Sequence, residues 1–264
     1  MNTQVLNTLS VAPRAANRAL GAYLQEIRCE ALRTVRNPGL AIPVLLMPVA
    51  LYALFTMVVT ADAIDRDPSI GIFLFSAFSI MGATMPALFG IGATLAMERE
   101  MGLLRLKRAQ PAPVAGWLVA KIVCGVGFGV LSYAPIALLA LLSGKIALEP
   151  SQIFAMSLVL IACSIPFCAM GLMVGALVRG SAAPGYANLF YLPGCYLSGM
   201  FFPLPQSMHW QAPIWPQFHV GQLAMHAADV TKFQFMPAQM SIAALVGFTV
   251  LFSAIAVWRM VSKG

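Results

Sequence analysis

Apolar residues dominate the chain in six long runs, which short polar segments separate. Each run is long enough to cross a bilayer, because about 20 residues at 1.5 Å per residue span the hydrocarbon core. The second, third and fourth runs exceed that length, so their helices can tilt or project beyond the bilayer. The runs predict six transmembrane helices at residues 39–60, 70–96, 114–143, 151–178, 184–202 and 237–258.

The segment before the first run divides into two parts. Residues 1–17 show no periodicity and are expected to form a disordered cytoplasmic tail, whereas residues 18–37 place apolar side chains on one helical stripe. The stripe consists of Leu20, Tyr23, Leu24, Ile27, Ala31 and Val35, and the other faces carry Arg28, Arg33 and Arg36. This pattern predicts an amphipathic interfacial helix that ends at Asn37-Pro38. A helix that merely anchors the first span is the alternative, and both interpretations stay open.

Composition agrees with a membrane protein. Hydrophobic residues make up 60% of the 264 residues and charged residues 9%, and the mean hydropathy is +0.83. A soluble domain is about 45–50% apolar and 25% charged, so an ordinary soluble protein is excluded, and so is a disordered chain. The five cysteines lack C-x-x-C spacing, so we interpret them as small buried hydrophobic residues and not as disulfides or zinc ligands. The sequence therefore predicts an all-α integral membrane protein, with residues 38–264 as one six-helix transmembrane domain.

Positive charges are distributed unevenly over the predicted loops. One side of the membrane would carry thirteen of the Lys and Arg residues and the opposite side three. The positive-inside rule then places both termini in the cytoplasm. Because topology explains the net charge of +7, we expect no nucleic-acid partner.

Motifs of catalysis and nucleotide binding are missing from the sequence. It contains no Walker A, H-E-x-x-H or G-x-S-x-G motif. Lys121 is the one clear ionisable residue inside a span, close enough to the cytoplasmic end for its ammonium to snorkel. His209, His219 and His226 are interpreted as interfacial side chains and not as a metal site, although His219 and His226 could share a helix face. We expect a chain that is not an enzyme and binds no metal.

Two segments are not explained by composition. Residues 97–113 read M-E-R-E-M-G-L-L-R-L-K-R-A-Q-P-A-P and predict a short basic helix after the second span. Acidic residues do not help topology, so Glu98 and Glu100 favour docking on a partner protein over a simple stop-transfer loop. Residues 188–228 are rich in aromatics and prolines and predict external re-entrant helices between the fifth and sixth spans.

Together these segments carry a family resemblance. E-R-E-M-G-L-L-R-L-K-R-A-Q-P (98–111) and N-L-F-Y-L-P-G-C-Y-L-S-G-M-F-F-P (188–203), with an amphipathic helix and six spans, resemble the permease subunit of ABC-2-type exporters. The resemblance implies a dimer of permeases in the bacterial inner membrane and a separate ATPase subunit that binds ATP and Mg²⁺, with no cofactor on this chain. The loop after span two would be the coupling helix.

The resemblance also assigns roles to residues. The ATPase-coupling residues would be Glu98, Arg99, Glu100, Gly102, Arg105 and Arg108. The substrate path would lie between two copies, along Phe78, Met85, Phe89, Phe190, Tyr191 and Tyr196. Spans two and five lack an aromatic belt, which favours an amphiphilic drug, antibiotic or lipid-like substrate over a sugar. The pair Gly171-x-x-x-Gly175 adds to the expectation of a homodimer.

A membrane-embedded enzyme that acts on lipid headgroups is the competing hypothesis. It would use Asp62, Asp65 and Asp67 with a divalent metal. Such an enzyme should carry carboxylates on several spans, and this chain offers them in one loop, so transport is favoured.

The charge asymmetry yields a topology prediction. A reporter fused after Gly264 should be cytoplasmic, and one inserted at Asp65 should be external, because thirteen of the Lys and Arg residues lie on one predicted side. The check is labelling of single cysteines with an impermeant reagent in intact cells. Labelling of a cysteine at position 107 from outside would overturn the orientation.

Overall fold

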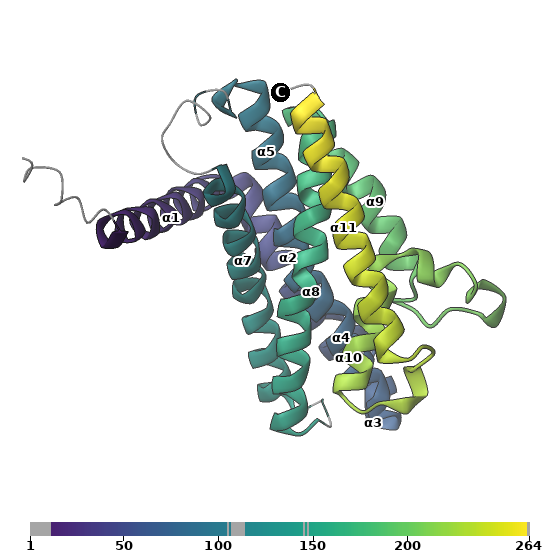
Figure 1. Ribbon diagram of the computed structural model, residues 1–264. Helices are drawn as coiled ribbons and strands as arrows, with labels where there is room; N and C mark the ends of the chain where they lie inside the picture. Colours follow the sequence, from purple (N-terminus) through teal and green to yellow (C-terminus); the bar gives the residue numbers. More distant parts are fainter. Residues whose placement is uncertain (1–11, 105, 107–113, 145, 147, 263–264) are drawn as a thin grey trace, which may run out of the picture.

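The computed structural model describes residues 12–104, 106, 114–144, 146 and 148–262. These residues form helices and loops, and no strand occurs among them. Figure 1 shows a bundle of long helices with α1 lying across its long axis. The end of α5 and the C-terminal helix α11 reach one end of the bundle, and α3 lies at the other end.

Most of the long helices lie within the apolar runs, and α1 covers the amphipathic segment before them. The long helices are α1 (Ala12–Val35), α2 (Pro38–Leu54), α4 (Pro68–Met85), α5 (Ile91–Glu100), α7 (Val114–Ser143), α8 (Pro150–Leu177), α9 (Ala183–Leu197) and α11 (Ala238–Ser262). The shorter elements are η1 (Phe55–Val59), α3 (Ala61–Arg66), η2 (Pro86–Gly90), η3 (Gly180–Ala182), η4 (Gln206–Met208), η5 (Ala212–Ile214), α10 (Pro216–Ala227) and η6 (Thr231–Phe233). Helix α1 begins upstream of the expected start at residue 18.

Among the described residues, five helices are long and apolar enough to cross a membrane. They comprise Ala41–Val59, Pro68–Glu100, Trp117–Ser143, Pro150–Leu177 and Ala238–Ser262. The expected fifth span corresponds to α9, which has 15 residues, about 22 Å at 1.5 Å per residue and short of the hydrocarbon core. The all-α membrane fold is therefore confirmed, whereas the count of six spans stays a prediction.

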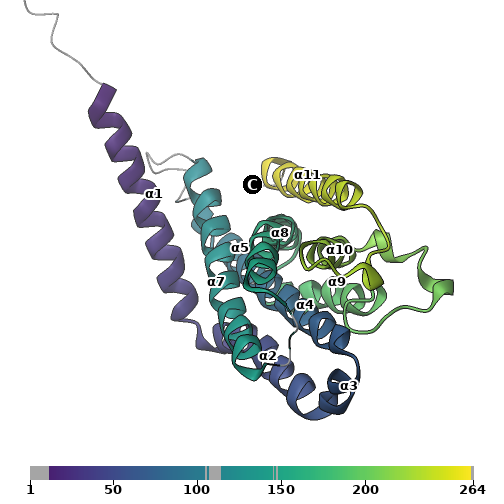
Figure 2. The ribbon, with the colours of Figure 1, turned by 90° about the horizontal axis from the view of Figure 1, so that it is seen from below.

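The span Pro68–Glu100 forms the centre of the bundle, and most of its residues are buried. It consists of α4, the π-helical turn η2 and α5. The turn begins at Pro86, which has no N–H to donate, and such a residue interrupts the regular helical hydrogen bonds. Helices α2 and α7 pack on α4, and α8 packs on α5. Figure 2 shows this arrangement, with α1 running beside α7 and extending beyond the bundle.

Glycines allow the helices around this central span to approach closely. A Cβ at Gly171 of α8 would lie 2.8 Å from the carbonyl oxygen of Leu88, and one at Gly175 would lie 2.8 Å from that of Gly92. The Gly171-x-x-x-Gly175 pair is therefore used inside the chain and not between two copies, which removes it as an argument for a dimer. On α7, a Cβ at Gly129 would lie 2.6 Å from the carbonyl oxygen of Ala83.

This packing predicts that two glycines of α7 differ in their tolerance of alanine. Gly129→Ala should lower the melting temperature of the protein in nanodiscs, because the new methyl group would press on the rigid backbone of α4. Gly127 has nothing within 4 Å of a Cβ, so Gly127→Ala is the matched control and should keep or raise the melting temperature. Equal melting temperatures for the two variants would contradict the helix contact.

Candidate coupling site at the end of α5

Three successive charged residues end α5, and each side chain contacts a different part of the chain. Glu98 meets α1 and α7, Arg99 meets the end of α8, and Glu100 meets the start of η3. Residues i, i+1 and i+2 of a helix point about 100° apart, which lets one turn reach three neighbours. The end of α5 is thus a junction of the bundle.

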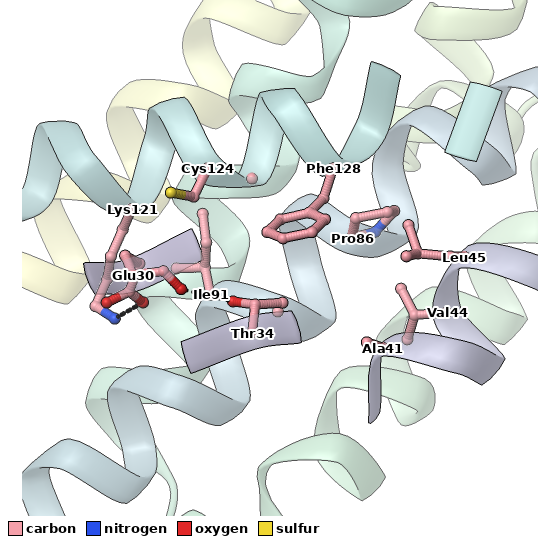
Figure 3. Close-up of a pocket in the computed structure, with 12 residues that line it drawn as sticks. Glu30, Thr34, Ala41, Val44, Leu45, Pro86, Ile91, Lys121, Cys124 and Phe128 are labelled. Carbon is pink, nitrogen blue, oxygen red and sulfur yellow. Dashed lines mark hydrogen bonds and ion pairs between the residues drawn. The ribbon is translucent and has the colours of Figure 1, made fainter. Parts of the chain in front are cut away.

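Glu98 belongs to a buried cluster of charges. Its side chain is 0% exposed; it pairs with Arg33 of α1, and its Oε2 lies 3.3 Å from Nζ of Lys121. Trp117 donates its indole N–H to the same oxygen over 3.2 Å. Nζ of Lys121 also lies 2.5 Å from Oε1 of Glu30. Figure 3 shows these two side chains turned toward each other. Two carboxylates and two cations compensate one another, which is the condition for burying such groups.

Lys121 differs from the expectation that its ammonium would snorkel to the membrane surface. The side chain is 0% exposed, contacts Glu30 and Glu98, and lies 3.2 Å from Oγ1 of Thr94. The difference arises because α1 packs against α7 and brings a carboxylate to the ammonium. The buried ion pairs replace the water that a snorkelling lysine would reach.

Arg99 and Glu100 bind the connection between α8 and α9. Nη1 of Arg99 donates to the carbonyl oxygen of Gly175 over 2.7 Å, and the last carbonyls of a helix have no partner within the helix. Oε2 of Glu100 accepts a hydrogen bond from the backbone N–H of Gly180 over 3.0 Å. A Cβ at Gly180 would lie 2.7 Å from that same oxygen and 3.0 Å from Cα of Met97, so a larger residue there would displace the carboxylate.

The remaining expected coupling residues divide into two groups. Gly102 has φ +71, a conformation that glycine adopts without strain, and the chain turns there after α5. Arg105 and Arg108 lie outside the described residues.

The side chain of Glu98 cannot be a surface contact for a partner, because other parts of the chain bury it. Any coupling role of Glu98 would therefore be indirect. Contact of the expected coupling residues with an ATPase stays a prediction.

The expected interfacial arginines occupy different environments on α1. Arg28 and Arg36 are exposed, whereas Arg33 is half-buried and turns its guanidinium to Glu98. Among the residues of α1 whose burial the structure describes, only Glu30 is buried. The face of α1 that meets the bundle is thus centred on an acid. Placement of α1 in the membrane interface stays a prediction.

The six residues expected along a substrate path do not share one surface. Four are buried within the chain, and two lie exposed on α9. The buried residues are Phe78, Met85, Phe89 and Tyr191, and the exposed ones are Phe190 and Tyr196. Tyr191 hydrogen-bonds Thr84 over 2.8 Å and packs edge-on against two phenylalanine rings. In this conformation only the outer face of α9 offers path residues to a substrate.

The histidines and the acidic loop contribute contacts to the segment 204–236. A ring nitrogen of His209, His219 and His226 lies 2.8–2.9 Å from a backbone carbonyl oxygen in each case. Burial lowers the pKa of His219. Asp67 pairs with Lys232 over 2.7 Å. In the part of the chain that the structure describes, no three His, Cys, Asp or Glu residues could together hold a metal ion.

The sequence indicated Glu98 and Glu100, but it did not indicate Glu30, the second acid beside Lys121, or Trp117, which donates to Glu98. A signal existed in α1, because Glu30 sits between Ile27 and Ala31, inside the apolar stripe. A charge in the middle of an apolar stripe, together with a lysine inside a span, indicates a buried pair. Nothing in the pattern tells which lysine meets which acid.

Comparison with known proteins identifies a family and a relative of this chain. The model of the family described as ABC-2 type transporter matches residues 24–227. A protein of Bacillus subtilis (strain 168), named "Putative transport permease YvfS", is 29% identical over 197 residues, which are 73% of this chain and 79% of that protein. The family match includes Glu30, the end of α5 and Lys121.

The buried cluster predicts a large effect for its lysine. Lys121→Ala leaves Glu30 and Glu98 without their ammonium, and breaking a buried pair typically costs about 3–5 kcal/mol of unfolding free energy. Denaturant titration in mixed micelles measures this. Lys232→Ala is the control, because its ion pair with Asp67 is exposed and should contribute little. Equal stability of the two variants would show that the cluster does not hold the fold.

Proposed function

The chain belongs to the ABC-2 type transporter family, and on this premise we propose that it is the permease subunit of an ATP-driven exporter of amphiphilic molecules. It is a multi-pass membrane protein and a transport permease. The observation that carries the proposal is the family match over residues 24–227, which extends from α1 to the end of α10. Export, the substrate class and the composition of the complex are the parts that we propose.

A separate ATPase subunit would supply the energy and hold ATP and Mg²⁺, since this sequence contains no Walker A motif. We propose two permeases and two ATPases in the bacterial inner membrane, with both termini in the cytoplasm. The charge asymmetry of the loops supports this orientation. In agreement with it, the C-terminal helix α11 ends at the same end of the bundle as α5 (Figure 1).

The junction at the end of α5 suggests how movement would spread. A partner that displaces the segment after Glu100 would also move α1 and α7 through Glu98. It would move α8 and η3 through Arg99 and Glu100. ATP can shift the permease between two arrangements only by as much as the partner prefers one of them. The charged contacts are the groups whose geometry would differ between those arrangements.

The outer face of α9 supports an amphiphilic substrate. A hollow of about 530 Å³ lies between the end of α8 and α9, lined by Tyr186, Phe190, Arg179 and aliphatic residues. Arg179 is the charged member of this otherwise apolar lining. Aromatic rings beside one cation suit a molecule with a large apolar part and one polar group. Phe190 is the expected path residue that this hollow contains.

Glu100 provides the sharpest test of coupling, because a Glu98 substitution would also disturb the buried cluster. Glu100→Ala removes the acceptor of the Gly180 N–H and should reduce substrate-stimulated ATP hydrolysis severalfold in the reconstituted complex, with insertion unchanged. Asp62→Ala, which removes an exposed acid of α3 at the other end of the bundle, is the control and should leave stimulation intact.

Native mass measurement of the reconstituted complex should give two permeases with two ATPases. Full stimulation in Glu100→Ala, or a complex with one permease, would contradict the proposal.

A further inference from the structure

We propose that the cavity between α4, α10 and the segments 198–213 and 233–236 binds a neutral amphiphile, a mainly apolar molecule without a charged group. The cavity has a volume of about 350 Å³. This lies within the range of about 300–1,000 Å³ that small-molecule sites occupy. It shares no lining residue with the hollow beside α9, and binding to the permease alone tests it, so the proposal does not rest on ATP-driven export.

The lining determines the chemical class of the ligand. Aromatic and aliphatic side chains form most of the wall: Phe73, Ile80, Met200, Phe218, Phe233 and Phe235. Serine, glutamine and histidine side chains interrupt it, and no Asp, Glu, Lys or Arg occurs among the described residues that line it. A charged ligand would lose its hydration there without gaining a counter-ion, so the cavity favours a neutral molecule.

Gln217 belongs to the lining, but its amide is directed to α9 and not into the cavity. The residue is 1% exposed, and its Oε1 has no hydrogen-bond partner among the described residues. Its Nε2 donates to the carbonyl oxygen of Tyr191 over 3.3 Å, which fixes the amide against α9. Buried polar groups rarely stay unpaired, and each exception calls for an explanation. Less than 1 Å² of this oxygen is accessible, and the amide lies against Gly194 of α9, so a ligand in the cavity would not reach it.

The outer wall of the cavity is preformed. Oε1 of Gln222 accepts the backbone N–H of Phe235 over 2.7 Å, and its Nε2 donates to the carbonyl oxygen of Phe233 over 3.1 Å. Lys232 ties the same segment to Asp67, and with Ser69 it lowers the pKa of Asp67 to about 2. A wall that is already in place loses little freedom when a ligand binds. The site should therefore bind without folding of the segment.

Photolabelling in nanodiscs tests the site. The probe is an octanol that carries a diazirine, applied to the purified permease without an ATPase, and mass spectrometry maps the labelled residues. We expect labels on α10 and on residues 233–236, and an excess of unmodified octanol should reduce them about tenfold or more. Labels spread over the lipid-facing helices, or labels here that octanol does not displace, would overturn the proposal.

A cavity-filling variant supplies the second measurement. A Cβ at Gly221 would meet only Cδ1 of Ile80, at 3.9 Å, so Gly221→Leu can place its side chain in the cavity without a backbone clash. This variant should lose the displaceable labels. Gly247→Leu, on the exposed face of α11 with nothing within 4 Å of its Cβ, is the matched control and should keep them. Unchanged labelling in a folded Gly221→Leu would overturn the proposal, and the wild-type map decides alone if that variant misfolds.

Competition separates the two sources of such a ligand. Diacylglycerol added to the nanodisc bilayer represents a neutral membrane lipid, and octanol added from solution represents a soluble molecule. Displacement by diacylglycerol would identify a lipid site, and displacement by octanol alone would identify a site for soluble amphiphiles. Either result supports the binding site, whereas failure of both competitors refutes it.

Discussion

A buried ammonium ion needs carboxylates beside it, and Lys121 obtains them from two helices that the sequence places far apart. Glu30 comes from α1 and Glu98 from α5, while Arg33 balances the second acid. Apolar contacts could hold α1 at many positions along α7, because they are non-directional. Ion pairs and hydrogen bonds have defined lengths and angles, so the cluster gives α1 one register on the bundle.

The cluster is also the place where the membrane bundle meets the segment proposed to bind an ATPase. Glu98, Arg99 and Glu100 are consecutive, yet the first faces inward and the third reaches the N–H of Gly180. Close glycine contacts between α8 and the central span make the bundle stiff beneath this junction. A displacement at the end of α5 would therefore move several helices together and would not be absorbed locally.

The sequence predicts the ends of the helices well where a glycine or a proline stands at the end of an apolar run. Helix α7 ends at Ser143, as expected, because Gly144 follows in the left-handed conformation. Helix α9 is shorter than expected, since the chain turns at Gly199, whose φ is +73, inside a run that still reads as apolar. The candidate site was predictable only in part. Glu98 and Glu100 stand out as acids in a basic segment, but their partners depend on the register between helices, which hydrophobic periodicity does not encode.

The separation of the cluster along the chain orders the events of synthesis. Glu30 leaves the ribosome well before Glu98, and Lys121 follows only with the third span. Chains emerge from the N-terminus, so α1 is made before α5 and α7. It nevertheless acquires its fixed position only after α7 has entered the bilayer. Until then Glu30 lacks the ammonium of Lys121, so α1 would lack this ion pair while the earlier helices of the bundle assemble.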